Sequence, residues 1–245
     1  MKLLVCVSKT PETTTKVSFT DGNTQFNTSG VQYIMNPYDE WYALVRAVEL
    51  KEKAAGSKVT LVNVGPASND SILRKGLAIG ADQALRVNAE PSSAYFVAAQ
   101  IAQYAKGMDI VFTGKETIDY NGSEVAAILA ELLDLPYISY ATDLQVEGNV
   151  ATVTREIEGG KEIVKVQMPF VVSASKGMAE QRIPNMRGIM QAKRKPLVVR
   201  EPKKMSDPVS IVQYTLPAPK SAVKLVDPED MDELVRLLHE EAKVI

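Results

Sequence analysis

Short apolar runs alternate with amphipathic segments over residues 1–135 of the chain. The apolar runs are rich in β-branched residues and predict strands at 3–8, 58–64, 84–88 and 109–113. Between them, apolar residues recur at helical spacing and predict helices at 37–55, 70–79, 92–106 and 123–133. Apolar strands joined by helices of this length form βαβ units. We therefore expect an α/β fold with a mainly parallel sheet and helices on both faces.

Turn and cap residues refine this outline at two places. Asn36 is a candidate N-cap for the first helix, and Pro37 fits its first turn. The sequence Asp21-Gly22-Asn23 lies between strand-like residues 16–19 and 24–26. It predicts a hairpin inserted after the first strand.

The hydrophobic pattern changes after Pro136. Alternating, strand-like runs follow at 138–146, 150–157, 162–167 and 170–174. The sequences Glu147-Gly148-Asn149 and Glu158-Gly159-Gly160 separate them and are typical of hairpin turns. We expect these strands to form an antiparallel extension of the same sheet.

The last part of the chain lacks the pattern of a core. Residues 176–195 show no strand pattern, and 196–228 are rich in proline with little periodicity. A final amphipathic helix is predicted to start at Asp227 and Pro228. We expect one α/β domain over 1–195 and, over 196–245, an extended C-terminal arm and helix that pack on another chain.

Composition narrows the function. The chain has 245 residues and a formal net charge of −2, which argues against nucleic-acid binding. We see no targeting leader and no membrane-spanning run, so we expect a protein that is not inserted in a membrane. The single cysteine, Cys6, lies in an apolar strand and is expected to be a buried structural thiol in a reducing compartment.

The usual catalytic signatures are missing from the sequence. The one histidine, His239, lies near the end of the terminal helix, and no cysteine or histidine spacing indicates a metal site. There is no nucleophile elbow, no Walker-type loop and no G-x-G-x-x-G run. We therefore expect no independent catalysis.

Small and polar residues follow the carboxyl ends of the predicted strands. They are Ser8-Lys9, Asn63–Pro66, Thr113-Gly114 and 118–123. Open parallel sheets bind ligands at this edge, and backbone amides around Gly122 at the start of a helix could hold a phosphate. These residues could equally be turn formers and caps alone. The residues by themselves leave both interpretations open.

Residues 153–173, VTREIEGGKEIVKVQMPFVVS, resemble the signature of electron transfer flavoprotein beta subunits. The segments 35–39, 64–66, 80–82 and 114–119 resemble further landmarks of that family, in the same order. The resemblance spans nearly the whole chain and is weakest at 200–228. It implies a Rossmann-like sheet that binds AMP structurally, beside an alpha subunit that holds most of the FAD.

The resemblance also implies which residues contact AMP. They are Cys6, Ser8, Asn36, Pro37, Tyr38, Asp39, Val64, Gly65, Asp119, Asn121, Gly122, Ser123, Glu124, Val125, Ala126 and Ala130. The run Ser123-Glu124-Val125-Ala126 departs from the family pattern, and a carboxylate at Glu124 is unfavourable beside a phosphate. Some relatives bind a second FAD in place of AMP and split electron pairs. We expect AMP here.

Residues 178–194 resemble the family's recognition loop, which docks on dehydrogenases. Met186 takes the place of the apolar anchor, with Ile183, Arg187 and Ile189 beside it. The alternative is a plain surface loop. On the strand pair, the resemblance implies that Arg155, Glu156 and Glu162 contact the flavin domain, and the alternative is solvated cross-strand charges.

The function implied is that of an electron carrier subunit without independent catalysis. FAD in the alpha partner accepts electrons from acyl-CoA or other flavin dehydrogenases, as in fatty acid oxidation. It then passes them to a membrane quinone oxidoreductase or another acceptor. We expect a cytoplasmic protein in bacteria, or a mitochondrial matrix protein in eukaryotes. The rivals are an electron-bifurcating relative and a stand-alone AMP- or ATP-binding module of the stress-protein type.

Overall fold

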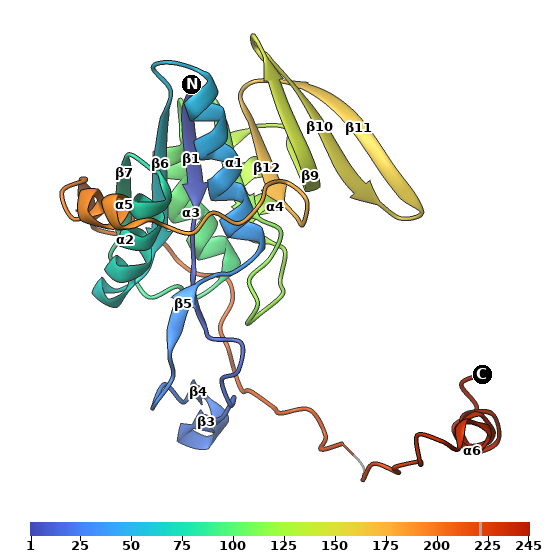
Figure 1. Cartoon of the computed structure of the whole chain (residues 1–245). Coiled ribbons are helices and arrows are strands. Elements are labelled where there is room, and N and C mark those ends of the chain that lie inside the picture. The colour runs from blue at the N-terminus through green and yellow to red at the C-terminus, as the bar shows by residue number, and fades with distance from the viewer. Residues whose placement is uncertain (221) are drawn as a thin grey trace. The chain divides into compact units, whose positions relative to one another are not determined.

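The computed structural model describes residues 1–220 and 222–245, so position 221 of the predicted arm lies outside the described residues. The described residues divide into two compact units (Figure 1). The first comprises 1–17 and 27–212, and the second comprises 18–26 and the described part of 213–245. The predicted division at 195/196 stays a prediction, and each unit is treated separately below.

A single sheet organises the first unit. Its described residues form nine strands in the order β11-β10-β9-β12-β8-β1-β6-β7-β13 (Figure 1). The parallel core comprises β1 (Lys2–Cys6), β6 (Lys58–Val64), β7 (Gln83–Val87), β8 (Ile110–Gly114), β12 (Phe170–Ala174) and β13 (Leu197–Arg200). One edge is made by β9 (Tyr137–Glu147), β10 (Val150–Ile157) and β11 (Gly160–Gln167). The expected mainly parallel α/β sheet is confirmed.

Helices cover both faces of this sheet. They are α1 (Asp39–Lys53), α2 (Asp70–Ile79), α3 (Ala94–Ala105), α4 (Val125–Leu133) and the short α5 (Met186–Ala192). On one face Leu3 and Val5 of β1 pack in a core with α1 and α2 residues such as Leu44 and Leu73. On the other face Leu4 of β1 packs with residues of α3 and α4. Successive side chains of β1 point to opposite faces of the sheet, so β1 contributes to two cores, one on each face.

Two strand predictions need correction. We grouped residues 170–174 with the antiparallel extension, but β12 pairs parallel with both β8 and β9. Within the described part of this sheet, only the ladders of β10 with β9 and with β11 are antiparallel. All five residues of β12 are buried, which suits an interior parallel strand rather than a half-exposed hairpin. We also predicted no strand beyond 195, yet β13 pairs with β7 at the sheet edge.

The helix starts also differ from the predictions. The first helix begins at Asp39, and Tyr38 occupies its N-cap position without a side-chain cap bond. Asn36 is therefore not the cap. The helix predicted from 123 begins at Val125, so Gly122 and Ser123 precede it rather than forming its first turn. None of the helices in the described ranges has the length and apolar character needed to cross a membrane.

The second unit contains the predicted hairpin. It is formed by β3 (Phe19–Thr20) and β4 (Gln25–Phe26) around the turn η1 (Asp21–Asn23). The Phe19 ring stacks on Tyr214 with centroids 4.7 Å apart, and the Tyr214 amide donates to the Asn23 carbonyl at 2.8 Å. The terminal helix α6 (Met231–Arg236), followed by η3 (Leu237–Glu241), starts later than predicted because Asp230 caps it.

Removal of a central aromatic side chain tests this core. Phe112 lies in β8 and is fully buried, so we expect Phe112→Ala to lower the free energy of unfolding by about 3–5 kcal/mol. Ile163 in β11 is 69% exposed, and Ile163→Ala should change it by no more than about 0.5 kcal/mol. Guanidinium unfolding followed by circular dichroism measures both. Equal losses in the two variants would contradict the assignment of β8 to the core.

Candidate functional site

The carboxyl ends of β1, β6 and β8 lie at one edge of the sheet. Parallel register places Cys6 beside Val62 and Val5 beside Phe112. The residues that follow these three strands therefore lie at the same edge of the sheet. The Val7 amide donates to the Val62 carbonyl, which extends the pairing towards Ser8. Three of the predicted segments, Ser8-Lys9, Asn63–Pro66 and Thr113-Gly114, therefore converge.

Asn36 joins the loop before α1 to this edge. Its backbone amide donates to the Ser8 carbonyl at 3.0 Å. Its fully buried side chain donates to the Glu116 carbonyl at 3.0 Å and accepts from the Ile118 amide at 3.1 Å. Asn36 thus bonds to both flanking loops at once. This is a stronger structural role than the cap we predicted.

Strained backbone conformations gather at the same place. Tyr38 has φ 63° and ψ −102°, and Asn121 and Ser123 also have positive φ. Non-glycine residues avoid these conformations unless their surroundings impose them, and such residues cluster at binding sites. Tyr38 is 58% exposed, so its ring faces outwards from this edge.

Glu40 is a site residue that the sequence analysis missed. It is 4% exposed in the first turn of α1, and both of its carboxyl oxygens contact Ser8. The Ser8 amide donates to Oε2 at 2.6 Å, and the Ser8 hydroxyl lies 2.7 Å from Oε1. Burial raises the pKa of Glu40 to about 8, against the lowering effect of the Ser8 bonds. Its position four residues before Leu44, on the buried stripe of α1, was the available signal.

Gly114 allows α1 to approach this closely. A Cβ atom at Gly114 would lie 2.8 Å from the Glu40 Cγ and 3.0 Å from the Glu40 backbone nitrogen. Backbone cannot yield at that distance, so only glycine fits at the end of β8. Gly65 is similarly crowded, because a Cβ atom there would lie 2.0 Å from the Asn69 Nδ2.

Cys6 is confined beneath the site. The Cys6 side chain is buried. Burial and, to a smaller extent, the negative charge of Glu40 raise the pKa of its thiol. A thiol that resists ionisation is a poor nucleophile. The geometry agrees with the structural role expected for it.

The loop after β8 carries paired charges. Lys115 Nζ lies 3.0 Å from Glu116 Oε1, and this bond lowers the pKa of Glu116. Ser123 Oγ donates to the same carboxylate at 3.3 Å. Glu124 is exposed at the start of α4 and makes no side-chain cap bond, so its carboxylate is free to turn outwards.

The remaining residues predicted to contact AMP differ in their exposure to solvent. Pro37 and Asp39 are half-buried, while Asp119, Asn121 and Gly122 are exposed along the loop. Val64, Ala126 and Ala130 are buried, so their side chains are covered and only their backbone could meet a ligand.

Exposed apolar residues mark the segment 178–194. Ile183 is 82% exposed, Met186 74% and Ile189 42%, and Met190, which we did not predict, is 66% exposed. Arg187 is exposed beside them. Scattered exposed apolar residues are ordinary, but four within eight positions form a patch.

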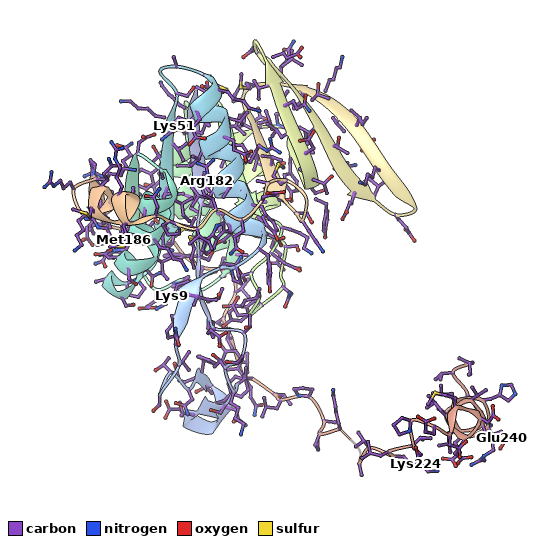
Figure 2. The ribbon with its side chains drawn as sticks, viewed as in Figure 1. Lys9, Lys51, Arg182, Met186, Lys224 and Glu240 are labelled. Carbon is purple, nitrogen blue, oxygen red and sulfur yellow. The ribbon has the colours of Figure 1, made fainter. Side chains whose placement is uncertain are left out.

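The backbone of this segment is fixed at both ends. Trp41 Nε1 donates to the Arg182 carbonyl, and Arg182 pairs with Glu52 at 2.7 Å. Figure 2 shows Arg182 over α1 and Met186 at the start of α5, next to α2. Arg74 donates to the carbonyls of Ala192 and Lys195. The patch is therefore displayed on an ordered backbone.

The charged residues of the strand pair β10–β11 differ in their contacts. Arg155 Nε donates to Glu162 Oε2 at 2.6 Å across the ladder, and Arg155 also donates to Ser139. Glu156 lies opposite Lys161 and is exposed. A contact with a flavin domain stays a prediction for all three predicted residues.

Comparison with known proteins places the chain in a family. The family model described as electron transfer flavoprotein domain matches residues 23–205. The electron transfer flavoprotein subunit beta of Bacillus subtilis is 37% identical, over 100% of both chains. The corresponding subunit of Syntrophomonas wolfei is 34% identical over 93% of this chain and 90% of its own. The human subunit is 32% identical over 94% of this chain and 95% of its own. The chain therefore belongs to the electron transfer flavoprotein family, among its beta subunits.

Proposed function

We propose that this chain is the AMP-binding and docking subunit of a heterodimeric electron transfer flavoprotein. The observation that carries the proposal is its likeness, over the whole length, to electron transfer flavoprotein beta subunits. An alpha subunit holds FAD, which accepts electrons from acyl-CoA or other flavin dehydrogenases. The electrons then pass to a membrane quinone oxidoreductase or another acceptor. The flavin supplies the redox chemistry, and this chain catalyses nothing alone.

The strand-end site suits a nucleotide for two reasons. The first amides of α4 have no intrahelical partner, and Glu124 does not cap them, so they are available to an anion. A Cβ atom at Gly122 would have no neighbour closer than 4.0 Å, which leaves room for a ligand to approach the backbone there. AMP fits these features with Ser8, Asn36–Asp39 and 119–124 around it.

The 178–194 segment suits a docking surface. Its exposed side chains include two methionines, whose thioethers adapt to differently shaped pockets. The bonds of Trp41 and Arg74 hold the backbone beneath them. We propose that Met186 enters an apolar pocket of the dehydrogenase.

The C-terminal arm suits contact with the alpha subunit. Val209, Val212, Val223 and Leu225 are 60–90% exposed on a proline-rich stretch. Apolar side chains at this exposure gain most from burial against another chain. Within 196–245, β13 pairs with β7 in this chain's own sheet, and we propose that the exposed apolar residues beyond β13 pack on the partner.

The cofactor content of the heterodimer distinguishes a site that holds AMP from one that holds a second FAD. We expect the purified heterodimer to release one FAD and one AMP when it is denatured. Chromatography with absorbance detection counts both. Two flavins and no AMP would indicate an electron-bifurcating relative and would overturn the AMP assignment.

Gly122→Val tests the position of the nucleotide. The branched side chain would occupy the space in which we place the ligand, so AMP retained per heterodimer should fall at least about tenfold. Gly160→Val is the matched control, because Gly160 has open space around it and begins β11 directly after the β10–β11 turn. Normal AMP content in Gly122→Val, or an equal loss in Gly160→Val, would refute the placement.

Met186→Ala tests the docking surface. Loss of a buried anchor at an interface typically costs about 1–2 kcal/mol, so electron uptake from the dehydrogenase should slow about five- to thirtyfold at limiting concentration. Val17→Ala, which removes another exposed apolar side chain, should leave the rate unchanged. Stopped-flow flavin reduction measures both. Unchanged rates for Met186→Ala with every dehydrogenase tried would exclude the anchor role.

A further inference from the structure

The contact between Glu40 and Ser8 gives the site a feature that nucleotide binding alone does not require. Glu40 is 4% exposed, and Ser8 occupies both of its oxygens. Within residues 1–220 and 222–245 Glu40 takes part in no ion pair. The charges that act on it, Asp119 and Asp39, are both negative. A buried carboxyl without a cation favours its protonated form.

The groups around Glu40 come from several elements. Asp39 on α1, Cys6 on β1 and Asp119 on the loop after β8 interact with it electrostatically. Beyond them, Lys115 and Glu116 of that loop act on Asp39, and Asp119 acts on Tyr33 of β5 (Tyr33–Met35). Burial raises the pKa of the Cys6 thiol and of the Tyr33 hydroxyl, so both stay neutral near pH 8. Its bond to Glu116 raises the pKa of Lys115, which stays charged. Burial raises the pKa of Asp39, which makes Asp39 the group to control for.

The protonation state of Glu40 determines what the Ser8 hydroxyl can do. When Glu40 is ionised, both oxygens only accept, so the Ser8 hydroxyl must direct its hydrogen to Oε1 at 2.7 Å. When Glu40 is protonated, Oε1 can donate to the Ser8 Oγ instead. The Ser8 hydrogen is then free to donate elsewhere, while the Ser8 amide still donates to Oε2. Ser8 is half-buried at the edge where the loops converge, so its hydroxyl can reach a ligand.

We propose that Ser8 is a proton-controlled donor that hydrogen-bonds the nucleotide only while Glu40 carries a proton. This rests on the proposed nucleotide site and makes Glu40 a positioning residue for it. Ionised Glu40 turns the hydrogen of Ser8 away from the ligand and adds a negative charge beside a phosphate-bearing molecule. Both effects weaken binding, so one proton is bound together with the nucleotide.

The direction and size of the pH effect follow. Because the nucleotide prefers the protonated acid, affinity is full below the pKa of about 8 and falls as the pH rises through it. About ten elevenths of Glu40 is protonated one unit below the pKa and about one eleventh one unit above, so affinity should fall about tenfold from pH 7 to pH 9. The second ionisation of a phosphate monoester, near 6, is largely complete in this range.

The experiment is titration calorimetry of AMP into the nucleotide-depleted heterodimer between pH 7 and pH 9. Wild-type affinity should fall about tenfold. Glu40→Gln should change less than about twofold, because its amide NH₂ donates to Ser8 Oγ at every pH while its oxygen accepts from the Ser8 amide. Asp39→Asn is the control for the other carboxyl with a raised pKa, and only its pH dependence is compared, because Asp39 is itself a predicted AMP contact. Its affinity should still fall with rising pH, over a range displaced to lower pH, because the negative charge of Asp39 helps to raise the pKa of Glu40.

Ser8→Ala separates the hydroxyl from simple charge repulsion. We expect lower AMP affinity than wild type at pH 7 and a flatter pH profile, and this variant carries the test if Glu40→Gln fails to assemble. A full tenfold dependence in Ser8→Ala or Glu40→Gln would overturn the proton-controlled donor, as would a flat wild-type profile. Failure of wild type to bind AMP at any pH would instead overturn the proposed nucleotide site.

Discussion

Parallel pairing of β1 with its neighbours β6 and β8 is the constraint on which the rest of the structure depends. Parallel strands end on the same side, so the chain must leave all three at one edge. The residues at this edge are therefore constrained by neighbouring elements. Gly114 packs directly against α1, and Asn36 hydrogen-bonds to two loops. The two cores on opposite faces support this edge, because successive residues of β1 contribute to each in turn. The chemistry of the site is a consequence of sheet topology rather than of a local motif.

Much of the fold could be predicted from the sequence, because hydrophobic periodicity reports burial directly. The strands and helices of the first 135 residues are close to those predicted. The placement of β12 could not be obtained in this way. Nearness in sequence to β11 suggested a hairpin, whereas the chain crosses back to pair with β8 in the sheet interior. The continuous apolar run Phe170–Ala174 did carry a signal for an interior strand.

The site was only partly predictable for a related reason. Which loops converge follows from strand order, and that could be expected. Which side chains bond across them depends on contacts between residues far apart in sequence. Asn36 resembles a cap in its local context, but its partners lie 80 and 82 positions away. Glu40 resembles a favourable acid in a first turn, and only its burial against Ser8 reveals a different role. Local patterns do not record such contacts.

The tight packing of α5 on α2 has a consequence for the thermodynamics of association. A Cβ atom at Gly188 would lie 2.4 Å from the Ala78 carbonyl oxygen, so the two backbones are in direct contact. Lys195 also donates to the carbonyls of Leu77 and Ala81 near the end of α2. The main chain beneath Met186 and Met190 therefore loses its conformational entropy when the protein folds, not when a partner arrives. In the docking proposed for this segment, association would restrict little beyond side-chain rotamers, which is a smaller entropic cost than ordering a loop. Each partner would then meet the same backbone, and exchange between partners would not require the loop to fold again.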